Sequence, residues 1–169
     1  MEAEMQIKSD NEIQLKTDED VLRLNIKDET GKDTGNYLEF DLNDLDYLLR
    51  LQEMVEQDKK NREYLRNQYL IIDKKQDHKG KKLFSSNEEA RIKVTNEFFK
   101  REAEIYDMFL GKGGVEKLLN GRSLTIARLD AIDELIEKQI LPKLEIQADD
   151  MKKRIMSKYS NVKRDDVIE

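Results

Sequence analysis

The sequence predicts a mainly α-helical protein with an N-terminal β-hairpin, an α+β fold built on a bundle of three to four helices. Apolar and polar residues alternate before about residue 41, and after it the apolar residues recur at helical spacing. One proline and seven glycines argue against a turn-rich all-β fold. We therefore expect residues 1–41 to form a hairpin segment, 42–142 a helical core, and 143–169 a charged C-terminal helix or tail.

The hairpin prediction rests on two alternating segments, Val21 to Lys27 and Tyr37 to Phe40. Turn-forming residues lie between them, so we expect the turn near Gly31 to Gly35. The segment Glu12 to Lys16 also alternates, and it could add a third strand. Because an isolated hairpin is only marginally stable in water, this one should pack on the helices or on a partner.

The first helix is predicted from Leu42 to Ile72, with Asp41 or Asn43 as its cap. Its middle, residues 57–62, is wholly polar. That run is either an exposed turn of one long helix or a break between two helices. We favour one long helix.

The second helix should begin with a capping box formed by Ser86 and Glu89. A wide apolar face with several aromatic residues follows, and Gly111 can take the left-handed conformation that ends a helix. Such an aromatic stripe is typical of a protein core. Phe98 and Phe99 point about 100° apart, however, so one of them could remain exposed as a partner contact.

Two shorter helical segments complete the predicted core. Residues Val115 to Leu119 make about one turn, which Asn120-Gly121 closes. The last helix starts at Ser123 or Thr125 and ends or bends at Pro142.

The charge is unevenly distributed within a total of −6. Residues 1–46 hold fourteen Asp or Glu and five Lys or Arg, a net charge of −9, which leaves +3 for residues 47–169. The simplest interpretation is a contribution to solubility, and a charged partner is the alternative.

Composition excludes several classes of site. The chain has no cysteine, which removes disulfides, Cys-bound zinc and thiol catalysis. No apolar run approaches the roughly 20 residues that a membrane-spanning helix needs. The N-terminus lacks the basic start and apolar core of a signal peptide. We expect a soluble protein that is not exported.

No motif predicts catalysis, a cofactor or a metal. Gly111-Lys112-Gly113-Gly114 lacks the spacing and the Ser or Thr of a phosphate-binding loop, which favours a helix cap and tight turn. His78, the only histidine, has no identifiable nucleophile or carboxylate to work with. The pairs Asp149-Asp150 and Asp165-Asp166 are expected by chance among 37 acidic residues. The acidic run 41–46 lacks the glycine and final glutamate of a calcium loop.

The lysine-rich loop at residues 74–82 holds five Lys against one Asp. Contact with nucleic acid phosphates is conceivable for such a loop. The overall acidic charge favours a solvated loop, so nucleic acid is not an expected partner.

Several short motifs together resemble a known family. They are the strand Tyr37-Leu38-Glu39-Phe40-Asp41-Leu42, the segment Glu97-Phe98-Phe99 leading to Asp107-Met108-Phe109-Leu110-Gly111-Lys112-Gly113, and Lys117-Leu118-Leu119-Asn120-Gly121-Arg122 leading to Asp130-Ala131-Ile132-Asp133-Glu134. From Tyr37 to about Ile146 the chain resembles small tail assembly chaperones of long-tailed phages and prophages of Gram-positive bacteria. Residues 1–36 depart from the family pattern.

The resemblance implies a non-enzymatic chaperone in the cytoplasm of the bacterial host. It would bind the phage tape measure protein and the tail-tube protein before assembly, without membrane contact. A homo-oligomer and a longer frameshifted form are left open. The alternatives are a structural tail component of the virion and a small acidic inhibitor of a nucleic-acid-binding partner.

A chaperone of this kind has to hold an apolar helical segment weakly and release it. The apolar side chains that we assign as candidate partner contacts come from the aromatic helix, the short turn after it and the C-terminal tail. They are Phe99, Tyr106, Phe109, Val115, Leu118, Leu119, Ile155 and Tyr159.

Overall fold

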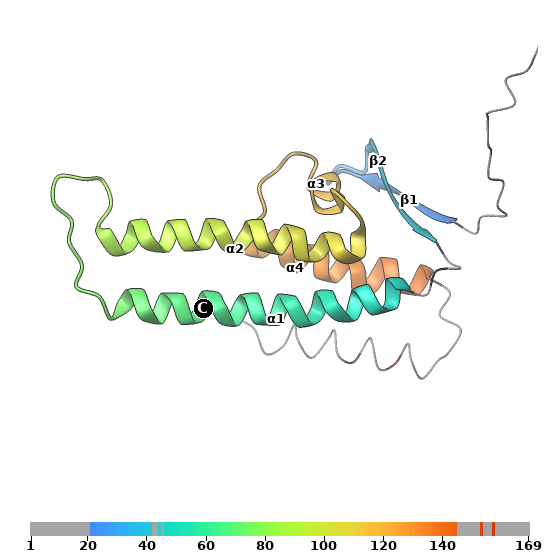
Figure 1. Cartoon of the computed structure of the whole chain (residues 1–169). Helices are drawn as coiled ribbons and strands as arrows, with labels where there is room; N and C mark the ends of the chain where they lie inside the picture. The colour runs from blue at the N-terminus through green and yellow to red at the C-terminus, as the bar shows by residue number, and fades with distance from the viewer. Residues whose placement is uncertain (1–20, 42–43, 45, 145–152, 154–156, 158–169) are drawn as a thin grey trace, which may run out of the picture.

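A two-stranded antiparallel hairpin followed by helices forms the fold of this chain (Figure 1). The computed structural model describes residues 21–41, 44, 46–144, 153 and 157. The predicted fold class is confirmed. The possible strand at Glu12 to Lys16 and most of the predicted C-terminal helix lie outside the described residues.

The hairpin consists of β1 (Val21–Lys27) and β2 (Asp33–Asp41). Its turn lies slightly earlier than the predicted Gly31 to Gly35, because the Asp28 carboxylate organises it. Asp28 accepts the backbone N–H groups of Thr30 and Lys32, each at 2.9 Å. Gly31 lies inside this turn with φ of 82°.

Helix α1 (Asp46–Asp73) is continuous, which confirms one long helix. It begins four residues after the predicted start at Leu42, and the Asp44 carboxylate accepts the N–H of Asp46 at 2.9 Å. The polar middle at residues 57–62 is not the exposed turn that the sequence suggested, because three of its side chains are buried.

Helix α2 (Ser86–Leu110) packs alongside α1 (Figure 1). The capping box is present one residue earlier than predicted. The Ser85 side chain accepts the N–H of Glu88 at 3.2 Å, and the Glu88 carboxylate accepts the N–H of Ser85 at 2.7 Å. The helix ends at Leu110 and Gly111 follows it, as predicted. The φ of Gly111 is positive, at 89°, but its ψ of 164° lies outside the left-handed helical conformation that we expected.

The remaining helices are short and follow in sequence order. They are α3 (Gly114–Leu119), α4 (Ile126–Leu135), the π-helix η1 (Ile136–Ile140) and the 3-10 helix η2 (Leu141–Lys143). Thr125 caps α4 by accepting the N–H of Arg128, which confirms one of its two predicted starts. Pro142 lies in η2, where the helical run ends.

One hydrophobic core joins the hairpin to the helices. It includes Ile26, Leu38 and Phe40 from the strands, and the Phe40 ring lies 5.3 Å from the Phe109 ring of α2. The hairpin is therefore packed on the helical core. Such packing is expected, because a two-stranded hairpin on its own is only marginally stable in water.

A buried polar cluster lies among α1, α2 and α4. Its members are Asp58, Asn61, Arg62, Glu102, Tyr106 and Asp133. Arg62 pairs with Asp58 at 2.7 Å and with Asp133 at 3.7 Å. The Tyr106 hydroxyl donates to Asp133 at 2.5 Å. These bonds link the three helices inside the core.

Glu102 is the most deeply buried member of this cluster, with no exposed surface. One of its oxygens accepts the Asn61 side-chain N–H at 2.6 Å, and the other, Oε2, has no hydrogen-bond partner among the described residues. Burial, followed by the negative charge of Asp58, raises the pKa of Glu102 to about 9. Glu102 is therefore protonated at neutral pH. Burial alone would lower the pKa of Arg62, but Asp58 more than offsets this and raises it.

We expect Arg62→Met to destabilise the fold by about 3–5 kcal/mol, because it leaves Asp58 and Asp133 buried without their cation. Arg66→Met is the matched control, since Arg66 is exposed one turn further along α1. It should change the free energy of unfolding by less than about 0.5 kcal/mol. Urea denaturation measures both, and equal losses would contradict a stabilising role for the cluster.

We expect Glu102→Gln to change the pH dependence of stability. With its pKa raised to about 9, Glu102 keeps a proton that the unfolded chain loses near pH 4.3, so the free energy of unfolding falls as pH rises between about 5 and 9. Glutamine cannot ionise, so the variant loses this dependence. Its stability relative to wild type should increase by up to about 1.4 kcal/mol per pH unit.

Urea denaturation at several pH values across that window tests the Glu102 prediction. A constant difference between Glu102→Gln and wild type would mean that Glu102 has the same pKa in the folded and unfolded chains.

Candidate protein-binding groove

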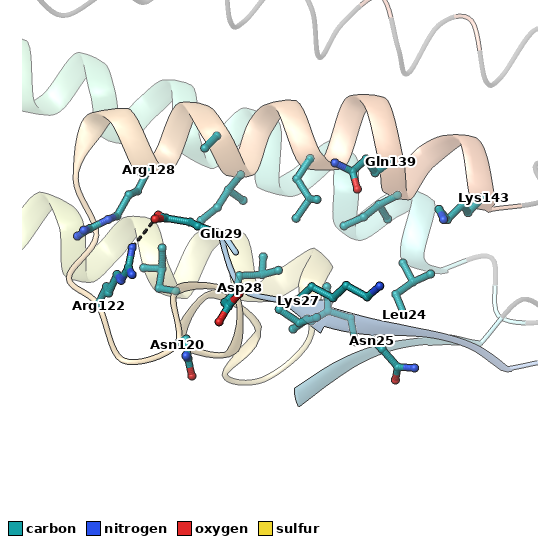
Figure 2. Close-up of a pocket in the computed structure, with 18 of the residues that line it drawn as sticks. Leu24, Asn25, Lys27, Asp28, Glu29, Asn120, Arg122, Arg128, Gln139 and Lys143 are labelled. Carbon is teal, nitrogen blue, oxygen red and sulfur yellow. Dashed lines mark hydrogen bonds and ion pairs between the residues drawn. The ribbon is translucent and has the colours of Figure 1, made fainter. Parts of the chain in front are cut away.

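A groove of about 680 Å³ lies between β1 with its turn on one side and α4, η1 and η2 on the other (Figure 2). Residues of α3 and of the connection after it close one end. The groove is bordered by segments far apart in sequence, and the Arg122 guanidinium bonds the Glu29 carboxylate across it at 2.6 Å. Its shape therefore depends on the tertiary fold.

The floor of the groove is apolar. Side chains from the hairpin, α3, α4 and η1 contribute to it, namely Leu24, Ile26, Leu38, Leu118, Leu119, Ala131, Ile132, Leu135 and Ile140. Several of them, including Leu24, Leu118 and Leu135, are only partly buried. Apolar surface that remains open to water in a concave site gains free energy when a ligand covers it.

The rim of the groove carries an excess of positive charge. Lys27, Arg128 and Lys143 border it, and none of them forms an ion pair with a carboxylate among the described residues. The two acidic side chains of the rim are already engaged. Glu29 pairs with Arg122, and Asp28 is held by the turn, where hydrogen bonds from Thr30 and Lys32 lower its pKa.

The π-helix η1 borders the groove through Gln139 and Ile140. A π-helical turn is wider than an α-helical one and is frequent at functional sites. Here it follows α4 directly, so the wall of the groove changes its helical period halfway along. Figure 2 shows Gln139 and Lys143 at the same end of this wall.

The structure separates the predicted partner contacts into three groups. Leu118 and Leu119 line the groove. Tyr106, Phe109 and Val115 are each at most 3% exposed, so we reassign them from partner contacts to the core.

Phe99 belongs to neither group, because it does not line the groove. Phe99 is half-buried and stacks edge-on against Phe98 at 5.2 Å between ring centroids. Ile155 and Tyr159 lie outside the described residues.

Sequence reasoning missed the basic rim and the hairpin side of the groove. Lys27, Arg128 and Lys143 are isolated in sequence, and no motif joins them. The available signal was the apolar face of the first strand, where Leu24 and Ile26 needed a covering surface.

The glycine loop after α2 binds a side chain of the protein itself. Both oxygens of the Asp107 carboxylate accept backbone N–H groups, one from Gly113 at 3.0 Å and one from Val115 at 2.9 Å. The N-terminus of α3 is therefore occupied by an internal anion. This agrees with the helix cap and tight turn that we favoured over a phosphate site.

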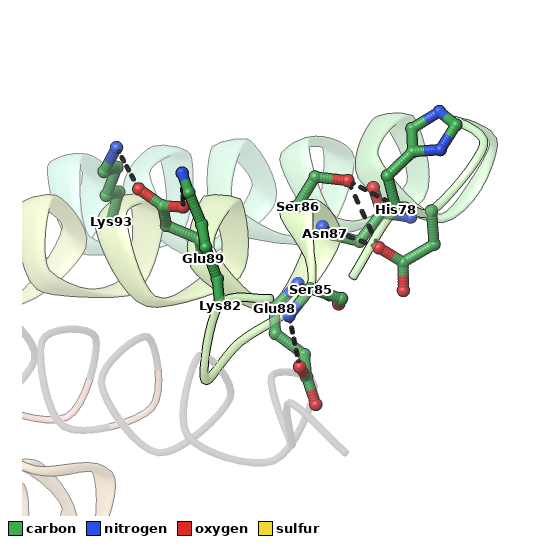
Figure 3. Close-up of polar contacts among 9 residues, drawn as sticks. His78, Lys82, Ser85, Ser86, Asn87, Glu88, Glu89 and Lys93 are labelled. Carbon is green, nitrogen blue, oxygen red and sulfur yellow. Dashed lines mark hydrogen bonds and ion pairs between the residues drawn. The ribbon is translucent and has the colours of Figure 1, made fainter. Parts of the chain in front are cut away.

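The lysine-rich loop between α1 and α2 is closed at its base by hydrogen bonds (Figure 3). Ser86 donates its N–H to the carbonyl of His78 at 2.7 Å, and the N–H of His78 donates to the Ser86 hydroxyl at 3.0 Å. His78 is exposed, and these contacts use its backbone. Lys82 pairs with Glu89 at 3.7 Å.

Two negative results apply to the described residues. No group of three or more His, Cys, Asp or Glu side chains there is arranged to hold a metal ion. Of the helices in that part of the chain, none has both the length and the apolar character that crossing a membrane requires.

Comparison of the chain with protein-family profiles, with curated proteins and with solved structures finds no match.

We expect Asp107→Ala to destabilise the protein by about 1–2 kcal/mol, because the N–H groups of Gly113 and Val115 lose their acceptor. Asp107→Asn keeps one side-chain oxygen and should lose less. Thermal unfolding measures both variants. Stabilisation of the wild-type protein by added inorganic phosphate would instead indicate an anion site in this loop.

Proposed function

We propose that this chain is a non-enzymatic protein that binds a segment of another protein in the groove between β1 and α4. The observation that supports this is a partly open apolar floor bordered by Lys27, Arg128 and Lys143. The two carboxylates at the rim of the groove already have partners, since Asp28 accepts hydrogen bonds within the turn and Glu29 forms an ion pair with Arg122. Such a site suits binding better than proton transfer.

The more specific proposal is a phage tail assembly chaperone. Its partners would be the tape measure protein and tail-tube subunits, and it would act in the cytoplasm of the bacterial host. This proposal rests on the resemblance of residues 37–146 to that family. The groove adds a physical means for it, since apolar contact supplies attraction while exposed cations keep the complex soluble and sensitive to salt.

The test is co-expression with a tagged tape measure protein from the same phage genome, followed by measurement of the co-purified chain. We expect retention of the wild type and a loss of at least about tenfold for Ala131→Arg. Ala131 is exposed and lines the groove, so arginine there fills the site, and arginine is a good helix former.

Ala127→Arg is the matched control, because Ala127 is exposed on the same helix but does not line the groove. It should be retained like the wild type. Equal retention of both variants would place the contact elsewhere. No retention of the wild type, with both proteins soluble, would contradict the chaperone proposal.

Purified phage particles separate the chaperone from the structural alternative. A chaperone that leaves before assembly should be absent from particles analysed by quantitative mass spectrometry. Its presence there in fixed proportion to the tail-tube protein would replace the chaperone proposal with that of a structural tail component.

A further inference from the structure

The groove runs along the outer edge of β1. Five consecutive residues of this strand, Arg23 to Lys27, border it. Successive side chains of a strand point to opposite faces, so a groove on one face would be bordered by alternate residues. Contact with every residue in turn means that the groove takes in the edge of the strand, with its backbone groups, as well as the core-facing side of the hairpin, from which Leu38 of β2 also lines it.

This edge is unpaired within the described part of the chain, where β1 pairs only with β2. In an antiparallel ladder, alternate residues direct their backbone N–H and C=O groups away from the neighbouring strand. Along β1 these groups therefore point away from β2, on the edge that borders the groove. They form a ready template for one additional strand.

We propose that the groove takes an extended acidic segment of the partner, which pairs with β1 as a third strand. The inference rests on the proposed function and specifies how the partner is held. Backbone hydrogen bonds to β1 supply part of the affinity, and side chains at alternate positions supply selectivity. This replaces the expectation of a bound helical segment.

The side chains around the edge define the sequence of that segment. On the core-facing side of β1 lie Leu24 and Ile26, and cross-strand neighbours share a face, so alternate partner residues should be apolar. The positions between them approach two cations that form no ion pair within the described part of the chain, Lys27 on the strand and Lys143 on the opposite wall. Carboxylates there complete the missing ion pairs.

Charge also argues against a second copy of this chain as the occupant. Antiparallel pairing of two β1 strands centred on Asn25 would place Arg23 of one copy opposite Lys27 of the other. Like charges directly opposite each other on neighbouring strands are destabilising. An acidic strand from a different protein avoids this repulsion.

The test uses the full chain and a capped seven-residue peptide of alternating Val and Glu. Two further peptides carry N-methyl groups, one on the Glu residues and the other on the inner Val residues. Backbone N–H groups of a strand alternate between its two edges. We expect one methylated peptide to bind at least about tenfold more weakly, because it loses the bonds to β1, while the other binds like the parent.

Each other result of the peptide titrations overturns a defined part of the inference. Equal losses for both methylated peptides, or no loss, would exclude a paired strand. A Val and Lys peptide that binds as tightly as the Val and Glu peptide would exclude the acidic preference. No peptide binding, together with retention by the tape measure protein, would remove the strand inference and leave the proposed function standing.

Hydrogen exchange of the peptide-free full chain identifies the competing occupants. The amides of β1 that point away from β2 should exchange quickly without peptide and slowly with it. Slow exchange without peptide would mean that the edge is already covered, which overturns the inference. If these slow exchange rates did not change with protein concentration, the covering segment would be residues 1–20 of the same chain. If the rates fell as the concentration rose, the covering segment would belong to a second copy.

Discussion

The pairing of Arg62 with two buried carboxylates is the constraint on which the arrangement of the helices depends. A buried charge is tolerated only when its partners are in place, and here they come from α1 itself and from Asp133 of α4. Asn61 and Glu102 add a bond from α1 to α2. Hydrogen bonds and ion pairs depend on distance and angle, so the bonds of Arg62 and Asn61 add a directional constraint to the apolar packing of the helices.

The position of the helices has a direct effect on the proposed binding site. Helix α4 forms one wall of the groove and β1 the other, and the cluster fixes α4 on the side that faces away from the groove floor. The hairpin is held separately, through Phe40 against Phe109 and through Glu29 to Arg122. The two walls are thus anchored by different interactions, one buried and polar, the other apolar with an exposed ion pair.

Much of the fold could be predicted from the sequence because its elements carry strong local signals. The alternation in β1, Gly111 at the end of α2 and Thr125 at the start of α4 all have the predicted roles. The capping box was one residue off, since Ser85 and Ser86 are both suitable caps. The polar run at residues 57–62 of α1 differs from its prediction, because polar side chains can be buried when they bond one another. Its spacing continues the buried positions Leu51 and Met54.

The groove could not be predicted in the same way, because its rim joins residues that only the tertiary fold brings together.

The loop between α1 and α2 has a practical consequence for the study of this protein. Hydrogen bonds join residues 75–78 to residues 86 and 87, so the loop is closed at its base where it leaves the two helices. A fluorophore or affinity tag inserted near Gly80 would lie at the opposite end of the molecule from the hairpin (Figure 1). Such a label would report on a partner bound in the groove without touching the residues that hold it.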